Sequence, residues 1–192
     1  MNQVIKTDKS FLNIYSLEEY NELISNCVED IKDKLLENPQ IQIYGKPAIQ
    51  HRSIGFFSNT SIGYYYSRQL AKSKPLTENL SLLLDKINNK FGTKFNGILV
   101  NKYIDGCDYI GAHSDDETCL DKSGVVAISY GATRKFRIRN KITKEIIVDI
   151  PTLSNNIMHM GGDFQKEFTH EIPIEKMVKD ARYSFTFRNH NK

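Results

Sequence analysis

Two stretches of the chain place apolar residues at helical spacing. The first runs from Leu17 to Leu35, after a Ser16-Leu-Glu-Glu19 sequence in the form of a capping box, and Asn38-Pro39 closes it. The second runs from Leu76 to Phe91 and stops at Gly92. We predict a helix over 17–35 and another over 76–91. Both are predicted to pack on the rest of the fold as scaffold.

The pattern changes to strands in the later part of the chain. Residues 41–44 are predicted as a short strand ended by a glycine, and 52–57 with 61–67 as a hairpin around the turn at 58–60. Further strands are expected at 95–103, 125–130, 135–139, 145–150, 155–159 and 182–188. An early helical region followed by a run of strands indicates an α+β fold, with the strands in a sandwich or barrel.

Composition points to an ordinary globular protein. With 192 residues, 40% of them hydrophobic and 26% charged, the chain is predicted to be a single domain and a monomer. No apolar run approaches membrane-spanning length, so we expect no membrane partner. The three cysteines, Cys27, Cys107 and Cys119, form no Cys-x-x-Cys pair. They favour a reducing intracellular compartment, with nucleus and cytoplasm both open.

Charge is unevenly divided. Residues 1–40 carry four Lys and eight Asp or Glu, whereas residues 41–192 carry 22 basic and 15 acidic residues. Six of the basic residues gather on one predicted strand and its turn, with Phe136 and Ile138 facing inward: Arg134, Lys135, Arg137, Arg139, Lys141 and Lys144. This basic stripe fits either a nucleic-acid backbone or a solvated strand face.

Two pairs of polar residues precede position 116. His113 and Asp115 are two residues apart, as are Asn101 and Tyr103, and in an extended chain such pairs share a face. A histidine and a carboxylate that converge on one point suit a divalent transition metal if a third ligand arrives from elsewhere. His170 is the natural candidate. It follows the Gly161-Gly162 turn, so we expect it in or beside an irregular segment.

The strand near the carboxyl terminus has two distinct faces. Its aromatic face holds Tyr183, Phe185 and Phe187, and its polar face holds two arginines, a serine and a threonine at positions 182, 184, 186 and 188. One interpretation is an outer strand whose polar face meets water. The other is a site for a small dicarboxylate, because guanidinium groups bind carboxylates in a bidentate manner.

The combined motifs resemble a known family. Asn-x-Tyr, His-x-Asp, a distant His and Arg-x5-Arg are similar in order and spacing to the AlkB-type iron(II)- and 2-oxoglutarate-dependent dioxygenases. DGCDYIGAHSDDE is especially similar to the eukaryotic AlkB homologues that repair alkylated DNA. The resemblance runs from about residue 41 to residue 189. It implies a double-stranded β-helix (jelly roll), with a second helix on the outer sheet and residues 1–40 as an amino-terminal helical segment beside the dioxygenase domain of residues 41–192.

The resemblance also implies the site. Iron(II) would be bound by His113, Asp115 and His170. The cosubstrate 2-oxoglutarate would be bound by Asn101, Tyr103, Arg182, Ser184, Thr186 and Arg188. Of these, Arg182 would pair with the distal carboxylate, and Arg188 would neutralise the metal-proximal end and help hold Asp115. With O2, such enzymes convert 2-oxoglutarate to succinate and hydroxylate an N-methyl group, which leaves as formaldehyde.

The implied substrate is an N-alkylated base of the N1-methyladenine or N3-methylcytosine type in DNA or RNA. Tyr64 and Tyr66 match positions that line the base pocket, and Arg52 matches one that touches phosphate or the opposite strand. Tyr44, followed by Gly45, falls where the duplex-repairing relative inserts an aromatic finger. The acids after the metal motif, Asp116 and Glu117, would contact the base amine. For Tyr44, Arg52, Asp116 and Glu117 the alternative is a surface role.

Two departures leave the strand preference open. Where the duplex-specific relative has a basic triplet, this chain reads Glu175-Lys176-Met177, and its loop over 140–145 is shorter. The same site would also suit a regulatory demethylase or hydroxylase acting on RNA bases or a protein side chain. A non-catalytic nucleic-acid-binding homologue is a further alternative, although it would have no chemical need for the metal-binding motif and both arginines.

Overall fold

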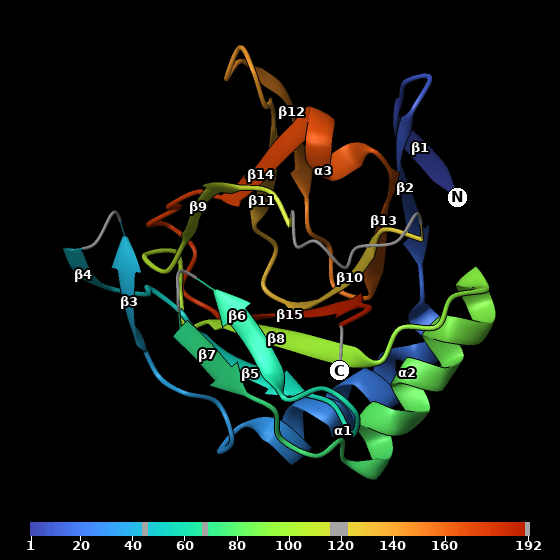
Figure 1. The fold of residues 1–192 in the computed structure, drawn as a ribbon, viewed down its shortest axis with the longest axis vertical. Coiled ribbons are helices and arrows are strands. Elements are labelled where there is room, and N and C mark those ends of the chain that lie inside the picture. Colours follow the sequence, from blue (N-terminus) through green and yellow to red (C-terminus); the bar gives the residue numbers. More distant parts are fainter. Residues whose placement is uncertain (44–45, 67–68, 116–122, 191–192) are drawn as a thin grey trace.

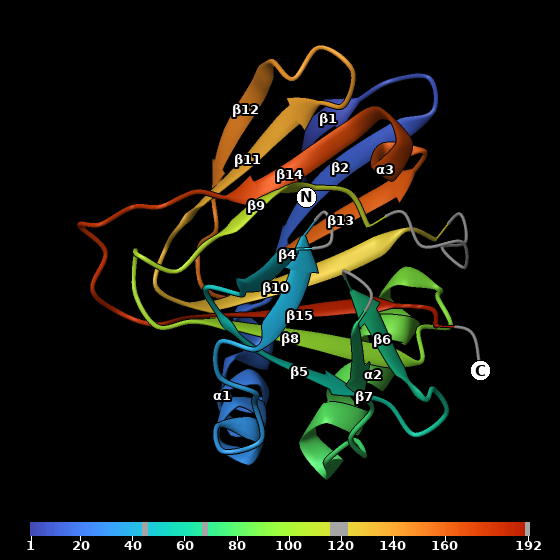
Figure 2. The ribbon, with the colours of Figure 1, turned by 60° about the vertical axis from the view of Figure 1, so that its left-hand side comes forward.

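The fold is built around two antiparallel sheets that face each other. The computed structural model describes residues 1–43, 46–66, 69–115 and 123–190, without the side chains of residues 43, 65, 66 and 69. Within this part a seven-stranded sheet faces a four-stranded one (Figure 2). The large sheet has the order β1 (Asn2–Lys6), β2 (Ser10–Ser16), β13 (Asn156–Gly162), β10 (Val125–Gly131), β15 (Arg182–Arg188), β8 (Gly97–Tyr103), β5 (Ser53–Phe57). The small sheet has the order β12 (Ile146–Pro151), β11 (Lys135–Asn140), β14 (Phe168–Ile172), β9 (Ile110–His113). This is the predicted α+β jelly roll.

Two helices cover the outer face of the large sheet. They are α1 (Asn21–Ile31), preceded by the short 3-10 helix η1 (Glu18–Tyr20), and α2 (Glu78–Phe91) (Figure 1). Their apolar faces join the aromatic face of β15 in one core, in which Phe185 and Phe187 are fully buried. A second core fills the space between the sheets and includes Phe136, Ile138 and Phe168. None of the helices in the described residues is long and apolar enough to cross a membrane.

The second predicted helix is confirmed, and the first is shorter than predicted. α2 begins after Thr77, whose hydroxyl accepts a hydrogen bond from the Leu80 amide, and it ends at Gly92 in the left-handed region at φ 63°. α1 ends at Ile31 rather than at residue 35. The predicted capping box is wrong because Ser16 is the last residue of β2, where it pairs with Asn156.

The amino-terminal segment also holds β1 and β2, which the sequence pattern did not predict. β2 pairs with β13 along its whole length, so these residues extend the large sheet. The sheet context therefore decides the conformation of a stretch whose own apolar pattern is weak. The boundary at residue 40 stays a prediction.

Several strands match their predicted ranges closely, namely β3 (Gln40–Ile43), β8, β10, β11, β12, β13 and β15. The predicted hairpin over 52–57 and 61–67 is wrong. β5 pairs with β8, whereas β6 (Gly63–Tyr66) pairs with β7 (Gln69–Lys72). Ser58 explains the departure, since its hydroxyl donates to the Asn96 carbonyl and accepts from the Ser61 amide, which directs the chain out of the sheet. β4 (Lys46–Ile49), β7, β9, β14 and α3 (Phe164–Glu167) were not predicted.

The basic stripe does not present a free row of cations. Arg134 is 1% exposed, and its guanidinium donates to the backbone carbonyls of Asp105, Asp108 and Pro173. It also pairs with Glu175 at 3.3 Å. On the outer face of the small sheet, the remaining arginines are neutralised by carboxylates: Arg137 by Asp149 and Glu171, and Arg139 by Glu171. These contacts favour a structural role for the stripe.

Replacement of Arg134 by alanine is expected to lower the free energy of unfolding by about 3 kcal/mol, because several buried or half-buried acceptors lose their donor together. The matched control is Arg137→Ala, which removes an ion pair that is partly exposed to water. Such a pair contributes at most about 1 kcal/mol. Urea unfolding of both variants measures the difference. Equal losses would show that Arg134 does not hold the loops on either side of the small sheet.

Candidate active site

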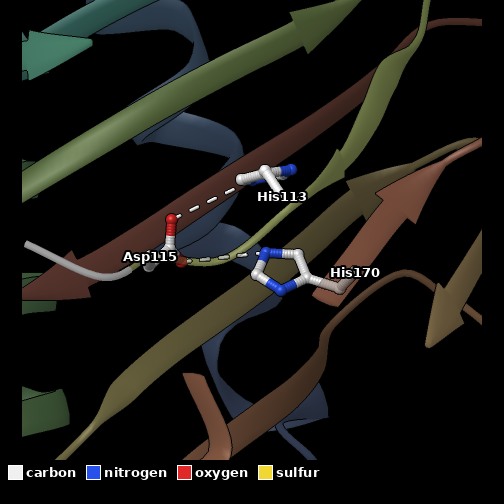
Figure 3. Close-up of side chains that lie close together, drawn as sticks. All are labelled: His113, Asp115 and His170. Atoms are coloured by element: carbon white, nitrogen blue, oxygen red, sulfur yellow. Dashed lines mark ion pairs between the residues drawn. The ribbon is translucent and has the colours of Figure 1, made fainter. Parts of the chain in front are cut away.

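Three metal-ligating side chains meet between the two sheets. His113 ends β9, Asp115 follows it by two residues, and His170 lies in the middle of β14. The backbone register sets His170 directly opposite His113. Figure 3 shows both imidazoles turned toward the Asp115 carboxylate, with Nε2 of His113 at 3.9 Å and Nε2 of His170 at 3.7 Å from its two oxygens. The ligand atoms of the three residues lie within 4.8 Å of one another.

Both histidines are held in the form that binds metals. Nδ1 of His113 lies 2.8 Å from the Gly111 carbonyl, which fixes the proton on Nδ1 and leaves Nε2 with its lone pair facing Asp115. The ring of His170 stacks on Phe136 with centroids 5.1 Å apart. Burial lowers the pKa of His113, and it lowers that of His170 to about 3. Both imidazoles are therefore neutral at physiological pH.

The carboxylate is held ionised. Burial by itself raises the pKa of Asp115, but the Arg188 guanidinium and the two imidazoles outweigh it and bring the pKa to about 2. Nη2 of Arg188 lies 3.1 Å from an Asp115 oxygen, and both side chains are almost completely buried. The predicted contact between Arg188 and Asp115 is thus present. Two neutral imidazoles and one anionic carboxylate form a donor set suited to a divalent transition metal.

The site opens into a cavity of about 550 Å³ that reaches solvent. Its floor is the polar face of β15, which contributes Arg182, Ser184, Thr186 and Arg188. All four are at most 7% exposed, so the interpretation of β15 as an outer strand with a solvated polar face is wrong. The aromatic face turns to the helices instead, because these offer the larger apolar surface.

Arg182 offers a buried anion-binding group in the wall of this cavity. Its Nε donates to Thr152 Oγ1 at 3.0 Å and its Nη2 to Ser129 Oγ at 2.9 Å. Its buried Nη1 makes no hydrogen bond to a described residue, and the neighbouring Tyr103 side chain stabilises the charged guanidinium. Burial lowers the pKa of Arg182 to about 10, which still leaves it charged at neutral pH. A buried cation with an unused donor is the complement of a ligand carboxylate.

The other predicted cosubstrate residues surround Arg182. Tyr103 lies opposite Arg182 in the β8–β15 register, and the guanidinium carbon is 5.3 Å from its ring centroid. Asn101 lies opposite Ser184 in the same register. These residues line the cavity together with Thr186. The structure therefore brings the whole predicted set together from two adjacent strands.

The candidate substrate residues have different outcomes. Arg52 is not a surface residue, because it is 6% exposed, lines the cavity and donates through Nε to Asn101 Oδ1 at 2.8 Å. Tyr64 also lines the cavity, with the Arg188 guanidinium 5.0 Å above its ring. Tyr66 belongs to β6, but its side chain lies outside the described part. The predictions for Tyr44, Gly45, Asp116 and Glu117 also fall outside the described residues.

Comparison with known proteins decides the family. A sequence profile of the 2OG-Fe(II) oxygenase superfamily matches residues 9–188. The chain belongs to this superfamily. The match begins well before residue 41, where the sequence resemblance was placed, and it takes in β2 and α1. The second strand and the first α-helix of the chain are thus part of the family's common sequence pattern, whereas β1 lies outside the match.

The relatives place the chain among the AlkB-type oxygenases. It is 26% identical over 189 residues to human DNA oxidative demethylase ALKBH2, covering 94% of this chain and 72% of that protein. It is 33% identical over 135 residues to human alpha-ketoglutarate-dependent dioxygenase alkB homolog 3, covering 65% of this chain and about half (47%) of that protein. The solved structure of OsALKBH1 superposes with a TM-score of 0.61 at 15% identity, covering 92% and 97% of the two chains, and supports the fold.

An enzyme of this superfamily uses iron(II) and 2-oxoglutarate, and the residues present fit both groups. The histidine–carboxylate–histidine set suits a non-haem iron(II) oxygenase, in which the ligands occupy one face and leave positions for cosubstrate and oxygen. The unpartnered Nη1 of Arg182 suits the far carboxylate of a dicarboxylic acid.

The positions of two residues near the site were not predicted from the sequence. Gln165 accepts a hydrogen bond from the Asp115 amide, and it stands in a short polar stretch that carries no motif. Arg134 was grouped with the outward-facing cations. Its position was readable, however, because period 2 places residue 134 on the same face as Phe136 and Ile138. The same alternation in Phe168, His170 and Ile172 would have placed His170 on a strand facing the core.

Proposed function

We propose that this protein is an oxidative demethylase of N-alkylated bases in nucleic acid. The observation that carries the proposal is the convergence, in one cavity, of the three metal-ligating side chains with the free donor of buried Arg182. Support for the substrate class comes from relatives, three of which are described as DNA oxidative demethylases. The mechanism below follows from the contacts of the chain's own residues.

His113, Asp115 and His170 would hold iron(II), which supplies the activation of O2 and the oxidation. The protein's part is to keep these three ligands in the right protonation state and place. Arg188 does this for the carboxylate, since its charge stabilises the anion in a buried site. The Gly111 carbonyl does it for His113. A rigid, pre-charged ligand set needs little rearrangement when the metal binds.

2-Oxoglutarate would lie along the polar face of β15. Its distal carboxylate would accept from Nη1 of Arg182, while Thr152 and Ser129 hold the other guanidinium nitrogens. The remaining contacts would come from Asn101, Tyr103, Ser184 and Thr186. Arg188, beside Asp115, would offset the negative charge of the cosubstrate's other end. In the reaction 2-oxoglutarate and O2 give succinate and CO2, and the second oxygen atom enters the substrate.

The second oxygen atom of O2 enters a C–H bond of the N-methyl group and gives N–CH2OH. The N–C bond then breaks, formaldehyde leaves, the hydroxyl proton is released, and the ring nitrogen regains its lone pair. A base must leave its stack to reach the cavity. Tyr64, Tyr66, Asp116 and Glu117 are proposed to bind it. Arg52 is proposed to act from inside the cavity wall through Asn101 rather than on the phosphate backbone. Tyr44 and Gly45 are proposed to contact the gap in the duplex.

The decisive experiment is mass spectrometry of a panel of oligonucleotides. Single- and double-stranded DNA and RNA carrying N1-methyladenine or N3-methylcytosine are incubated with the protein, iron(II), 2-oxoglutarate and ascorbate. We expect one methyl group lost and one formaldehyde formed for each succinate. Unmethylated oligonucleotides of the same sequence are the control. Stimulation of succinate formation by methylated peptides, with every methylated oligonucleotide left intact, would refute the proposal.

A further inference from the structure

The backbone of Asp115 lies outside the sheet that positions His113. The pairing of β9 with β14 joins Ile110 to Ile172 and His113 to His170, and β9 ends at His113. The backbone of Asp115 is therefore outside this ladder, although the residue is only 6% exposed. A buried amide needs an acceptor. Gln165 supplies it, with Oε1 2.9 Å from the Asp115 nitrogen.

Gln165 is itself firmly placed. It is 8% exposed, lies on α3 and directs its amide nitrogen toward the Met160 sulfur at 3.8 Å. A second contact ties the same two segments together, because the Ser114 hydroxyl donates to the Phe168 carbonyl at 2.9 Å. The stretch from Gln165 to Phe168 thus holds both residues that follow His113.

The far end of α3 is anchored to other parts of the fold. Glu167 accepts hydrogen bonds from the hydroxyls of Thr7 and Ser10, at the turn between β1 and β2. Its backbone carbonyl accepts from the Lys141 amide at 2.9 Å, at the turn between β11 and β12. α3 is therefore fixed to both sheets, which makes Gln165 a rigid acceptor for the Asp115 amide.

We propose that Gln165 is a positioning residue for the iron-binding carboxylate. This rests on the proposed assignment of iron to His113, Asp115 and His170. Arg188 fixes the carboxylate end of Asp115, and Gln165 fixes its backbone end, so the side chain is held at both ends. Loss of a group that orients a metal ligand typically weakens metal binding about 10- to 100-fold. Gln165 reaches the metal only through Asp115.

The test is cobalt(II) binding, followed by the visible absorption of the bound ion. Cobalt(II) accepts the same nitrogen and oxygen ligands as iron(II), and its bands report the coordination geometry without turnover. Gln165→Met keeps the length of the side chain and removes the acceptor. We expect cobalt(II) affinity to fall by about 10-fold or more, with altered bands. Gln165→Glu keeps an acceptor and is expected to recover most of the affinity and the original bands.

Two controls separate the outcomes. Lys166→Met changes the exposed neighbour on α3 and is expected to bind cobalt(II) like the unmodified protein. Asp115→Ala tests the site itself, so undiminished binding there would remove the iron assignment. If Asp115→Ala loses binding while folded Gln165→Met keeps both affinity and bands, the iron assignment stands and the role of Gln165 is refuted.

A further variant covers a folding defect. If thermal melting shows that Gln165→Met does not fold, Gln165→Asn takes its place, because it keeps the amide but withdraws the acceptor from the Asp115 nitrogen. Gln165→Asn is then expected to show the same loss of cobalt(II) affinity. Normal cobalt(II) binding by folded Gln165→Asn would overturn the proposal. A Gln165→Glu protein that binds cobalt(II) no better than Gln165→Met or Gln165→Asn would overturn it as well.

Discussion

Replacement of Asp115 by alanine is expected to reduce succinate formation by more than about 100-fold, since loss of a ligand should exceed the effect of losing a group behind it. The carboxylate is the anionic member of the three-residue set, and its pKa of about 2 keeps it charged throughout the physiological range. Without it, two neutral imidazoles remain beside the buried cation Arg188, which repels a divalent metal. Succinate is measured by chromatography with iron(II) and 2-oxoglutarate in excess.

Two further variants guard this result against a folding artefact. Asp115→Asn keeps the size of the side chain and an acceptor for Arg188, so it separates loss of charge from loss of packing. Asp149→Ala removes a different carboxylate, one that pairs with Arg137 on the outer face of the small sheet, and is expected to leave activity intact. Succinate formation by folded Asp115→Ala at the rate of the Asp149→Ala control would exclude Asp115 as a metal ligand.

The candidate site was more predictable than the elements that carry it. Asn101 and Tyr103 share a face of β8 because of their spacing, and the alternation in β15 sorts Arg182 and Arg188 from the phenylalanines whatever the topology. Such alternation depends only on residues that are close in the sequence, so it holds whichever strands pair with each other. Which sheet a strand joins is a different matter, because it depends on partners that are distant in the sequence.

The failures follow from this difference. Ser16 has the sequence context of a helix cap, but it is taken up by the ladder with Asn156, 140 residues later in the chain. Residues 53–57 were paired with the next strand, whereas they pair with β8 across the intervening α2. A glycine pair was interpreted as a turn before His170, yet Gly161 and Gly162 end β13, and their missing side chains admit the Phe11 ring and the Lys9 backbone. Long-range pairing overrode each local signal.

Buried charge was the other property that composition could not supply. Arg52 and Arg134 look like surface arginines in composition, and both are almost fully buried with specific acceptors. Arg52 faces Asn101 in the cavity wall, and Arg134 closes the loops that flank the small sheet. Composition counts a charge but does not say whether water or a carbonyl surrounds it. The net charge of +3 therefore overstates the cations available to a polyanionic partner.

Replacement of Arg182 by alanine is expected to raise the KM for 2-oxoglutarate about 10- to 150-fold, because one charge-assisted hydrogen bond contributes about 1.5–3 kcal/mol. The reason is geometric. Thr152 and Ser129 occupy Nε and Nη2, so Nη1 is the nitrogen left for the ligand carboxylate. Arg182→Lys retains the charge but has a single nitrogen, which cannot contact both hydroxyls and the ligand at once. We expect a KM between those of the alanine variant and the unmodified protein.

The substrate dependence provides the internal control for Arg182. The residue lies beside Tyr103, Thr152 and Ser129, and no contact with the nucleic acid is proposed for it. The KM for a methylated oligonucleotide, measured at saturating 2-oxoglutarate, should therefore change little in Arg182→Ala. Thermal melting shows whether the two hydroxyls tolerate the loss of their donor. If folded Arg182→Ala raises the KM for 2-oxoglutarate and the KM for the oligonucleotide equally, Arg182 lies outside the cosubstrate site. Its Nη1 would then not bind the 2-oxoglutarate carboxylate proposed for it.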